Sequence, residues 1–153
     1  MKAVEMYAEG DQIEAIDSAM VKFGMPMGPF RLMDEIGLDI CYHVARDLKD
    51  RLEMYYSLEE ISWRVQSGVL GKKTKKGFYT YNNGRSIKKR ITKNVDVSCL
   101  VDTMTDEAQK VIDEKVIDDP NMLDFAMIMG TGWAPFRGGP LKHAEQSLLA
   151  HSS

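Results

Sequence analysis

A short sequence pattern occurs twice in this chain and constrains its fold more than any other feature. Residues 16–21 read IDSAMV and lead into a glycine-rich turn that ends at Gly28-Pro29. Residues 123–128 read LDFAMI and lead into a second such turn, which ends at Gly139-Pro140. An internal repeat of this kind indicates two copies of one structural unit. We therefore predict two related helical units, each with a helix, a glycine/proline turn and a second helix.

Each copy of the repeat carries an aspartate at the same position, Asp17 in the first and Asp124 in the second. A carboxylate accepts hydrogen bonds, and the backbone N–H groups at a turn and at a helix start need acceptors. We predict that each aspartate binds backbone N–H groups of its own turn. An acid also follows each proline by five residues, Asp34 in the first copy and Glu145 in the second.

The remaining patterns predict an all-α fold with an extended connector between the two repeats. Asp11 and Glu14 resemble an N-cap with its reciprocal acid, and Pro29 suits the first turn of the following helix. In the second repeat, Asp119 is expected to be the N-cap of a helix and Pro120 its first residue. From Leu38 the spacing predicts an amphipathic helix. Its apolar face is expected to contain Cys41, Val44, Ala45, Leu48 and Leu52.

The connector is strongly basic. Residues 71–93 hold nine lysines and arginines and no acid, so the rest of the chain carries −12 of a net charge of −3. This pattern fits a solvated loop, or a patch for phosphates of a nucleotide-like tail or of nucleic acid. The acidic remainder and the lack of a binding motif argue against nucleic acid. Within the connector, the aromatic-rich segment 77–81 and the turn signal Asn83-Gly84 indicate a short strand or hairpin.

The domain division follows from these patterns. Residues 1–93 would form the first repeat with its basic connector, and residues 94–153 the second repeat. A chain of 153 residues with 44% hydrophobic content is globular in type, and no apolar run approaches the roughly 20 residues of a membrane span. Two cysteines do not form a disulfide framework, so we expect a cytoplasmic location.

No catalytic group is evident in the sequence. His43, His143 and His151 stand in no metal-ligand spacing and beside no nucleophile, so we predict no catalytic residue and no metal ligand. The glycines at 130 and 132 do not form a dinucleotide fingerprint, because the third glycine position is Pro135 and a helix precedes them. We therefore expect no cofactor-binding residue on this chain.

At three ordered strings the chain resembles a known family. Residues 23–30, followed by Asp34 and residues 37–39, resemble the C-terminal domain of 3-hydroxyacyl-CoA dehydrogenases. Residues 71–81 fit the segment that follows in that family. Residues 130–141 resemble the second copy of the domain, which is typical of the long α subunit of the fatty acid oxidation complex. Trp133 stands where that family commonly has phenylalanine.

The resemblance implies an all-helical domain of an enzyme that oxidises L-3-hydroxyacyl-CoA to 3-oxoacyl-CoA with NAD in fatty-acid β-oxidation. In the family a preceding Rossmann domain binds NAD and supplies a catalytic His–Glu pair. A further catalytic Asn stands shortly before the position where this chain begins. None of these has a counterpart here, so the isolated chain is expected to be inactive and to hold no cofactor.

The resemblance also implies a site and partners. By position, Pro26, Met27, Gly28, Pro29 and Phe30 would line one wall of the acyl-CoA cleft. The partners expected are acyl-CoA, the Rossmann and hydratase domains, the thiolase β subunit and a second copy of the chain, because an apolar surface left by a missing domain favours dimerisation. The alternative is a stand-alone, non-catalytic module that binds acyl-CoA or a partner chain.

Overall fold

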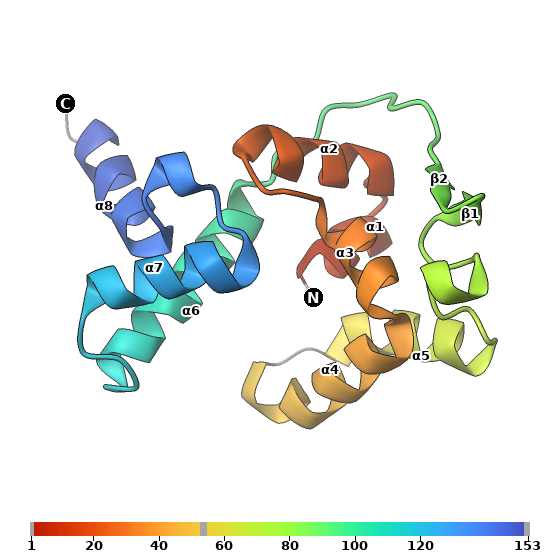
Figure 1. The fold of residues 1–153 in the computed structure, drawn as a ribbon, viewed down its shortest axis with the longest axis horizontal. Coiled ribbons are helices and arrows are strands. Elements are labelled where there is room, and N and C mark those ends of the chain that lie inside the picture. The colour runs from red at the N-terminus through yellow and green to blue at the C-terminus, as the bar shows by residue number, and fades with distance from the viewer. Residues whose placement is uncertain (1, 53–54, 152–153) are drawn as a thin grey trace. The chain divides into compact units, whose positions relative to one another are not determined.

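The computed structural model describes residues 2–52 and 55–151. Within this part the chain forms eight α-helices, two 3-10 turns and one two-stranded hairpin (Figure 1). The predicted all-α class with an extended connector is confirmed. Two compact units are present: the first holds the residues up to Ala19 with Met27–Val95, and the second holds Met20–Pro26 with the residues from Asp96 onwards. The repeat division at residues 93 and 94 stays a prediction, since these units are defined by contacts.

The first unit is built from five helices. They are α1 (Lys2–Ala8), the first part of α2 (Ile13–Phe23), α3 (Pro29–Ile36), α4 (Leu38–Leu52) and α5 (Tyr55–Gln66). Helix α4 packs along α5, while α1 packs against α5 and α3 against α4. Their fully buried side chains include Ile16, Phe30 and Ile61. Pro29 begins α3 as predicted, because its missing N–H lies where a helix has no internal acceptor for it.

The predicted capping box at Asp11 and Glu14 is wrong. Helix α2 begins at Ile13, and the backbone N–H of Asp11 donates to the Met6 carbonyl at 3.0 Å. The Glu14 carboxylate accepts from the backbone N–H of Lys89 at 2.9 Å. Glu14 therefore ties the connector to α2, which is a contact over 75 residues of sequence that local spacing cannot predict.

The predicted apolar face of α4 is only partly buried. Ala45 is buried, Cys41 and Leu48 are half-buried, and Val44 is 53% exposed. Helices α3 and α5 cover α4 over a narrower arc than its apolar stripe, so the stripe continues onto the surface. The side chain of Leu52 lies outside the described part.

The connector forms the predicted hairpin. A 3-10 turn, η1 (Lys72–Thr74), precedes strand β1 (Thr80–Asn82), which pairs antiparallel with β2 (Arg85–Ile87). Asn83 and Gly84 both have positive φ, at 48° and 75°. This backbone conformation matches the right-handed twist of a hairpin and favours the Asn-Gly pair.

The second unit contains α6 (Ser98–Asp113), α7 (Pro120–Thr131), η2 (Pro135–Arg137) and α8 (Pro140–His151). Helix α8 packs against both α6 and α7. As predicted, Asp119 caps α7, where its side chain accepts from the Asn121 N–H at 2.9 Å. Trp133 is fully buried beside Phe23 and His143, and burial lowers the pKa of His143. This histidine is a packing residue.

Candidate functional site

The first glycine/proline turn is fixed by Asp17. One carboxylate oxygen accepts from the backbone N–H of Phe30 at 2.9 Å, and the other accepts from that of Arg31 at 3.0 Å. Both donors belong to the first turn of α3, where helical N–H groups have no internal acceptor. The negative charge also faces the positive end of the helix dipole. Asp17 therefore sets the direction in which the chain leaves the turn.

Asp124 does the same in the second unit. Its two oxygens accept from the backbone N–H groups of Leu141 at 2.9 Å and Lys142 at 3.0 Å, in the first turn of α8. The prediction that each repeat aspartate binds backbone N–H groups is confirmed, with the donors just after the proline in both copies. The repeated sequence thus encodes one structural motif, in which an aspartate of one helix binds the first turn of the next helix.

The glycine before each proline is required by this motif, because it lies against the aspartate. A Cβ atom on Gly28 would overlap Asp17, and one on Gly139 would overlap Asp124. Any larger residue would push the aspartate away from the helix start that it caps. In both turns the glycine therefore packs directly against the aspartate.

A second buried aspartate, Asp34 in α3, holds the connector. It is 1% exposed and accepts from the backbone N–H groups of Phe78 at 2.8 Å and Tyr79 at 2.9 Å. The Tyr81 hydroxyl donates a third bond to it at 2.8 Å. Glycine is required at position 77, because a Cβ atom there would overlap the Asp34 carboxylate. In the second repeat the corresponding acid, Glu145, is exposed.

The two aspartates are linked through the connector. Tyr79 donates its hydroxyl to Asp17 at 2.8 Å while its backbone N–H binds Asp34. Burial raises the pKa of Asp17, although its three hydrogen bonds act in the opposite direction. Around the hairpin, Arg31 lies over the Tyr81 ring and donates to the Ser86 hydroxyl at 2.9 Å. The turn, α3 and the connector therefore form one hydrogen-bonded body.

The hydroxyls of Tyr79 and Tyr81 are expected to titrate only when the first unit unfolds. Burial, followed by the adjacent carboxylates, raises both pKa values above the ordinary range for tyrosine. The folded chain then binds more protons than the unfolded chain above pH about 10, so stability falls as pH rises beyond that value. Absorbance at alkaline pH should show a late tyrosinate phase that the Tyr79→Phe/Tyr81→Phe double variant loses. A late phase of unchanged size in that variant would contradict the assignment.

The structure places the five sequence-predicted wall residues at different depths. Met27 is 37% exposed and Pro26 is exposed as well, while Pro29 is half-buried. Gly28 is buried against Asp17. Phe30 is fully buried, with its ring edge-on to Phe78 at 4.7 Å between centroids. Pro26 belongs to the second unit and the other four belong to the first.

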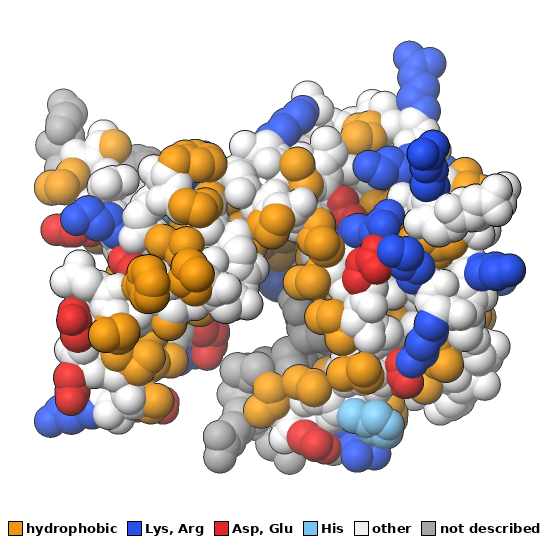
Figure 2. Space-filling model, viewed as in Figure 1, with side chains coloured by type: hydrophobic (Ala, Val, Ile, Leu, Met, Phe, Trp, Pro, Cys, Tyr) orange, Lys and Arg blue, Asp and Glu red, His pale blue; other side chains and the backbone are white. Residues whose placement is uncertain are grey.

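Met27 shares its unit with further exposed apolar side chains. Figure 2 shows hydrophobic side chains gathered over α3 and α4. We call this set the α3–α4 apolar strip, and its members are Met27, Leu32, Ile36, Ile40 and Val44. A contiguous apolar surface of this kind marks a place where another molecule or domain packs. The sequence signal was the apolar stripe of α4, which is too wide to be covered by two neighbouring helices.

The connector lysines have local partners. Lys72 pairs with Glu35 at 2.8 Å and Lys73 pairs with Asp39 at 2.6 Å. These contacts explain part of the basic run as a charge match to α3 and α4. In the residues that the structure describes, no group of His, Cys, Asp and Glu side chains could hold a metal ion. Nor does any helix in that part have the length and apolar character needed to cross a membrane.

A nicotinamide dinucleotide does not fit the glycine pair at positions 130 and 132. Thr131 ends α7, and Gly132 is the residue after that end, with φ 71°. The phosphates of such a cofactor need a glycine-rich loop between a strand and the N-terminus of a helix. Here the glycines follow a helix, as the sequence indicated.

Known proteins similar to this chain agree with the fold. A family model described as "3-hydroxyacyl-CoA dehydrogenase, C-terminal domain" matches residues 1–81. The fatty acid oxidation complex subunit alpha of Idiomarina loihiensis is 33% identical over 97% of this chain. The protein of the same name from Shewanella sp. strain ANA-3 is 32% identical over 94% of the chain. This chain spans 23% of the length of each relative.

A solved structure has a similar fold. It is the crystal structure of the dehydrogenase part of multifunctional enzyme 1 from C. elegans, with a TM-score of 0.52 and 24% sequence identity. The match covers 86% of this chain and 35% of that one. At this identity the likeness concerns the fold.

Proposed function

This chain belongs to the family of 3-hydroxyacyl-CoA dehydrogenase C-terminal domains, and we propose that it forms one wall of the acyl-CoA cleft in an L-3-hydroxyacyl-CoA dehydrogenase of fatty-acid β-oxidation. The observation that carries the proposal is an exposed apolar surface beside a rigid turn. Met27 adjoins Gly28, which Asp17 fixes, and Met27 is a member of the α3–α4 apolar strip.

Acyl chains are bound mainly by burial of their methylene groups, at about 0.8 kcal/mol for each group. An unbranched methionine adapts to chains of different shape. The apolar strip offers such a surface without any charged member. Phe30 would support the wall from beneath, since its ring lies in the core of the first unit.

The chemistry of hydride transfer would come from other parts of the enzyme. It needs a bound nicotinamide and a positioned acid or base, and the glycines at 130 and 132 do not fit the nicotinamide cofactor. We propose that a Rossmann domain supplies NAD binding and a catalytic His–Glu pair. A hydratase domain, a thiolase β subunit and a second copy of the chain complete the proposed assembly, and the proposed location is the cytoplasm.

The isolated chain is expected to show no oxidation of NADH with acetoacetyl-CoA. Activity is expected from a chimera in which this chain replaces the aligned part of the Idiomarina loihiensis subunit. In that chimera, Met27→Asp should raise KM for the acyl-CoA about tenfold, because a charge in an apolar wall costs at least 1.4 kcal/mol of binding.

The matched control is Val116→Asp, which introduces the same charge at an exposed valine of the second unit. Its KM should stay within twofold of the parent chimera. NADH oxidation by the isolated chain would contradict the assignment of the chemistry to other domains. Equal KM values for the two variants would contradict the wall. Tight acyl-CoA binding by the isolated chain in calorimetry would favour the stand-alone module instead.

A further inference from the structure

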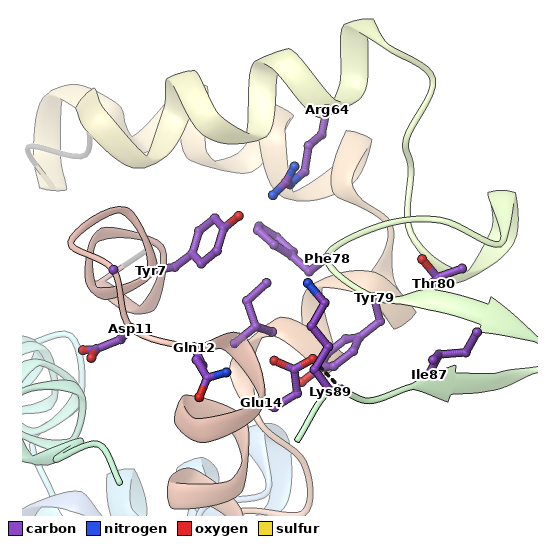
Figure 3. A pocket seen from close by; sticks show the side chains of 12 residues that line it. Tyr7, Asp11, Gln12, Glu14, Arg64, Phe78, Tyr79, Thr80, Ile87 and Lys89 are labelled. Carbon is purple, nitrogen blue, oxygen red and sulfur yellow. Dashed lines mark hydrogen bonds between the residues drawn. The ribbon is translucent and has the colours of Figure 1, made fainter. Parts of the chain in front are cut away.

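A pocket of about 430 Å³ lies within the first unit, and none of the residues predicted to form the acyl-CoA wall lines it (Figure 3). Its walls come from α1, the start of α2, α5 and the connector. This volume is in the range of small-molecule sites, which are mostly apolar with a few convergent polar groups. Tyr7 and Phe78 supply aromatic surface, with their rings edge-on at 6.3 Å between centroids.

Arg64 is the most unusual group in this pocket. The residue is 8% exposed, and its guanidinium lies over the Phe78 ring at 4.6 Å. One terminal nitrogen pairs with Glu60 at 2.8 Å. Its Nε is buried and has no hydrogen-bond partner within the described part of the chain. Figure 3 shows the guanidinium extending from α5 toward Tyr7 and Phe78. A buried donor without an acceptor costs stability, so such a group in a pocket indicates an absent acceptor.

A second cation enters from the opposite side. In Figure 3 the Lys89 side chain extends from the connector toward Phe78 and Arg64. The nearest acid on α2 is Glu14, whose Oε1 is occupied by the backbone N–H of Lys89. Asp11 also lines the pocket, at the entrance to α2. Two cations thus approach the aromatic side chain of Phe78, and two acids, Asp11 and Glu14, line the same pocket.

We propose that this pocket binds a small organic phosphate. The phosphate would accept a hydrogen bond from the Arg64 Nε–H and pair with the Lys89 ammonium, since charged donors of this kind are the strongest partners for phosphate oxygens. The flat apolar body of the ligand would pack against Tyr7 and Phe78. This site shares no lining residue with the proposed acyl-CoA wall, although Phe78 packs against Phe30. It gives the basic connector a role beyond its ion pairs with α3 and α4.

The test uses all 153 residues of this chain and three probes. Phenyl phosphate carries both the anion and the ring, inorganic phosphate carries only the anion, and benzyl alcohol carries only the ring. The readout is the side-chain Nε–Hε signal of Arg64 in ¹⁵N NMR, which reports a new acceptor at that atom. We expect a saturable shift with phenyl phosphate, a weaker one with inorganic phosphate and none with benzyl alcohol.

Lys89→Gln should weaken phenyl phosphate binding about tenfold, the effect of one charge-assisted hydrogen bond. Lys88→Gln is the matched control, because Lys88 is the exposed neighbour, carries the same charge and is not a lining residue. It should change binding by less than twofold. Both lysines are exposed, so neither variant is expected to impair folding.

No shift at millimolar phenyl phosphate would overturn the site, as would equal weakening in the two lysine variants. Inorganic phosphate binding as tightly as phenyl phosphate would overturn the role of the aromatic wall. If the chimera experiment contradicts the acyl-CoA wall, the phosphate proposal is not affected. That experiment tests Met27, whereas this one tests Arg64 and Lys89.

Discussion

Replacement of Asp34 by alanine is expected to lower the free energy of unfolding of the first unit by about 3 to 5 kcal/mol. The substitution removes the acceptor of two backbone N–H groups and of the Tyr81 hydroxyl. Each buried donor left without an acceptor costs about 1 to 3 kcal/mol, and water has little access at a residue that is 1% exposed. Residues 78–81 would then lose their anchor on α3.

Amide hydrogen exchange measures this effect locally. The Phe78 and Tyr79 amides should exchange several hundred-fold faster in Asp34→Ala, while α6 to α8 should change little. The matched control is Asp39→Ala, which removes an exposed carboxylate paired with Lys73 at 2.6 Å. A surface pair is worth about 1 kcal/mol or less. Similar exchange rates in the two variants would show that Asp34 does not hold the connector.

The repeat could be read from the sequence because its cause is local. Each copy of the motif consists of an aspartate, a glycine and a proline at matched positions. All three lie within a short stretch of chain. The sequence alone therefore predicts that Asp17 and Asp124 bind backbone N–H groups of their own turns. Helix starts at Pro29 and Pro120 followed for the same reason, since proline acts through its own missing N–H.

The role of Asp34 could not be read in this way. Its partners are 44 to 47 residues distant along the chain, and no periodicity links a buried acid to a later aromatic strand. The repeat even suggested a false symmetry, because Glu145 occupies the corresponding place and is exposed. The two copies therefore share their turn, whereas the connector bound by Asp34 belongs to the first unit.

The sequence does not predict the pocket around Arg64, for a related reason. Its lining comes from four separate parts of the first unit, and none carries a binding motif. Glu14 is an example: its spacing from Asp11 predicts a helix cap, but its carboxylate accepts from the backbone N–H of Lys89, which is distant in sequence. The high positive charge of residues 71–93 was the available signal, but charge alone did not identify which lysine faces a pocket.

Gly28→Ala is expected to destabilise the first unit by about 3 kcal/mol or more. Gly28 has φ −77°, which alanine adopts freely, so the entire effect would come from the overlap of the new methyl group with Asp17. Overpacking of a buried contact costs about 1 to 3 kcal/mol, and displacement of Asp17 adds the loss of its bonds to Phe30 and Arg31. Denaturant unfolding of the purified chain measures the difference.

Gly139→Ala should act in the same way on Asp124 and cost about 1 kcal/mol more, because its φ of 103° is also unfavourable for alanine. The control is Gly130→Ala in α7, where a Cβ would meet no atom within 4 Å and alanine favours the helix by up to about 1 kcal/mol. Because Met27 adjoins Gly28, Gly28→Ala should also raise KM in the chimeric enzyme, whereas Gly139→Ala should not. A neutral Gly28→Ala would mean that the turn can shift without loss, and the rigid wall on which the proposed function rests would then lack its support.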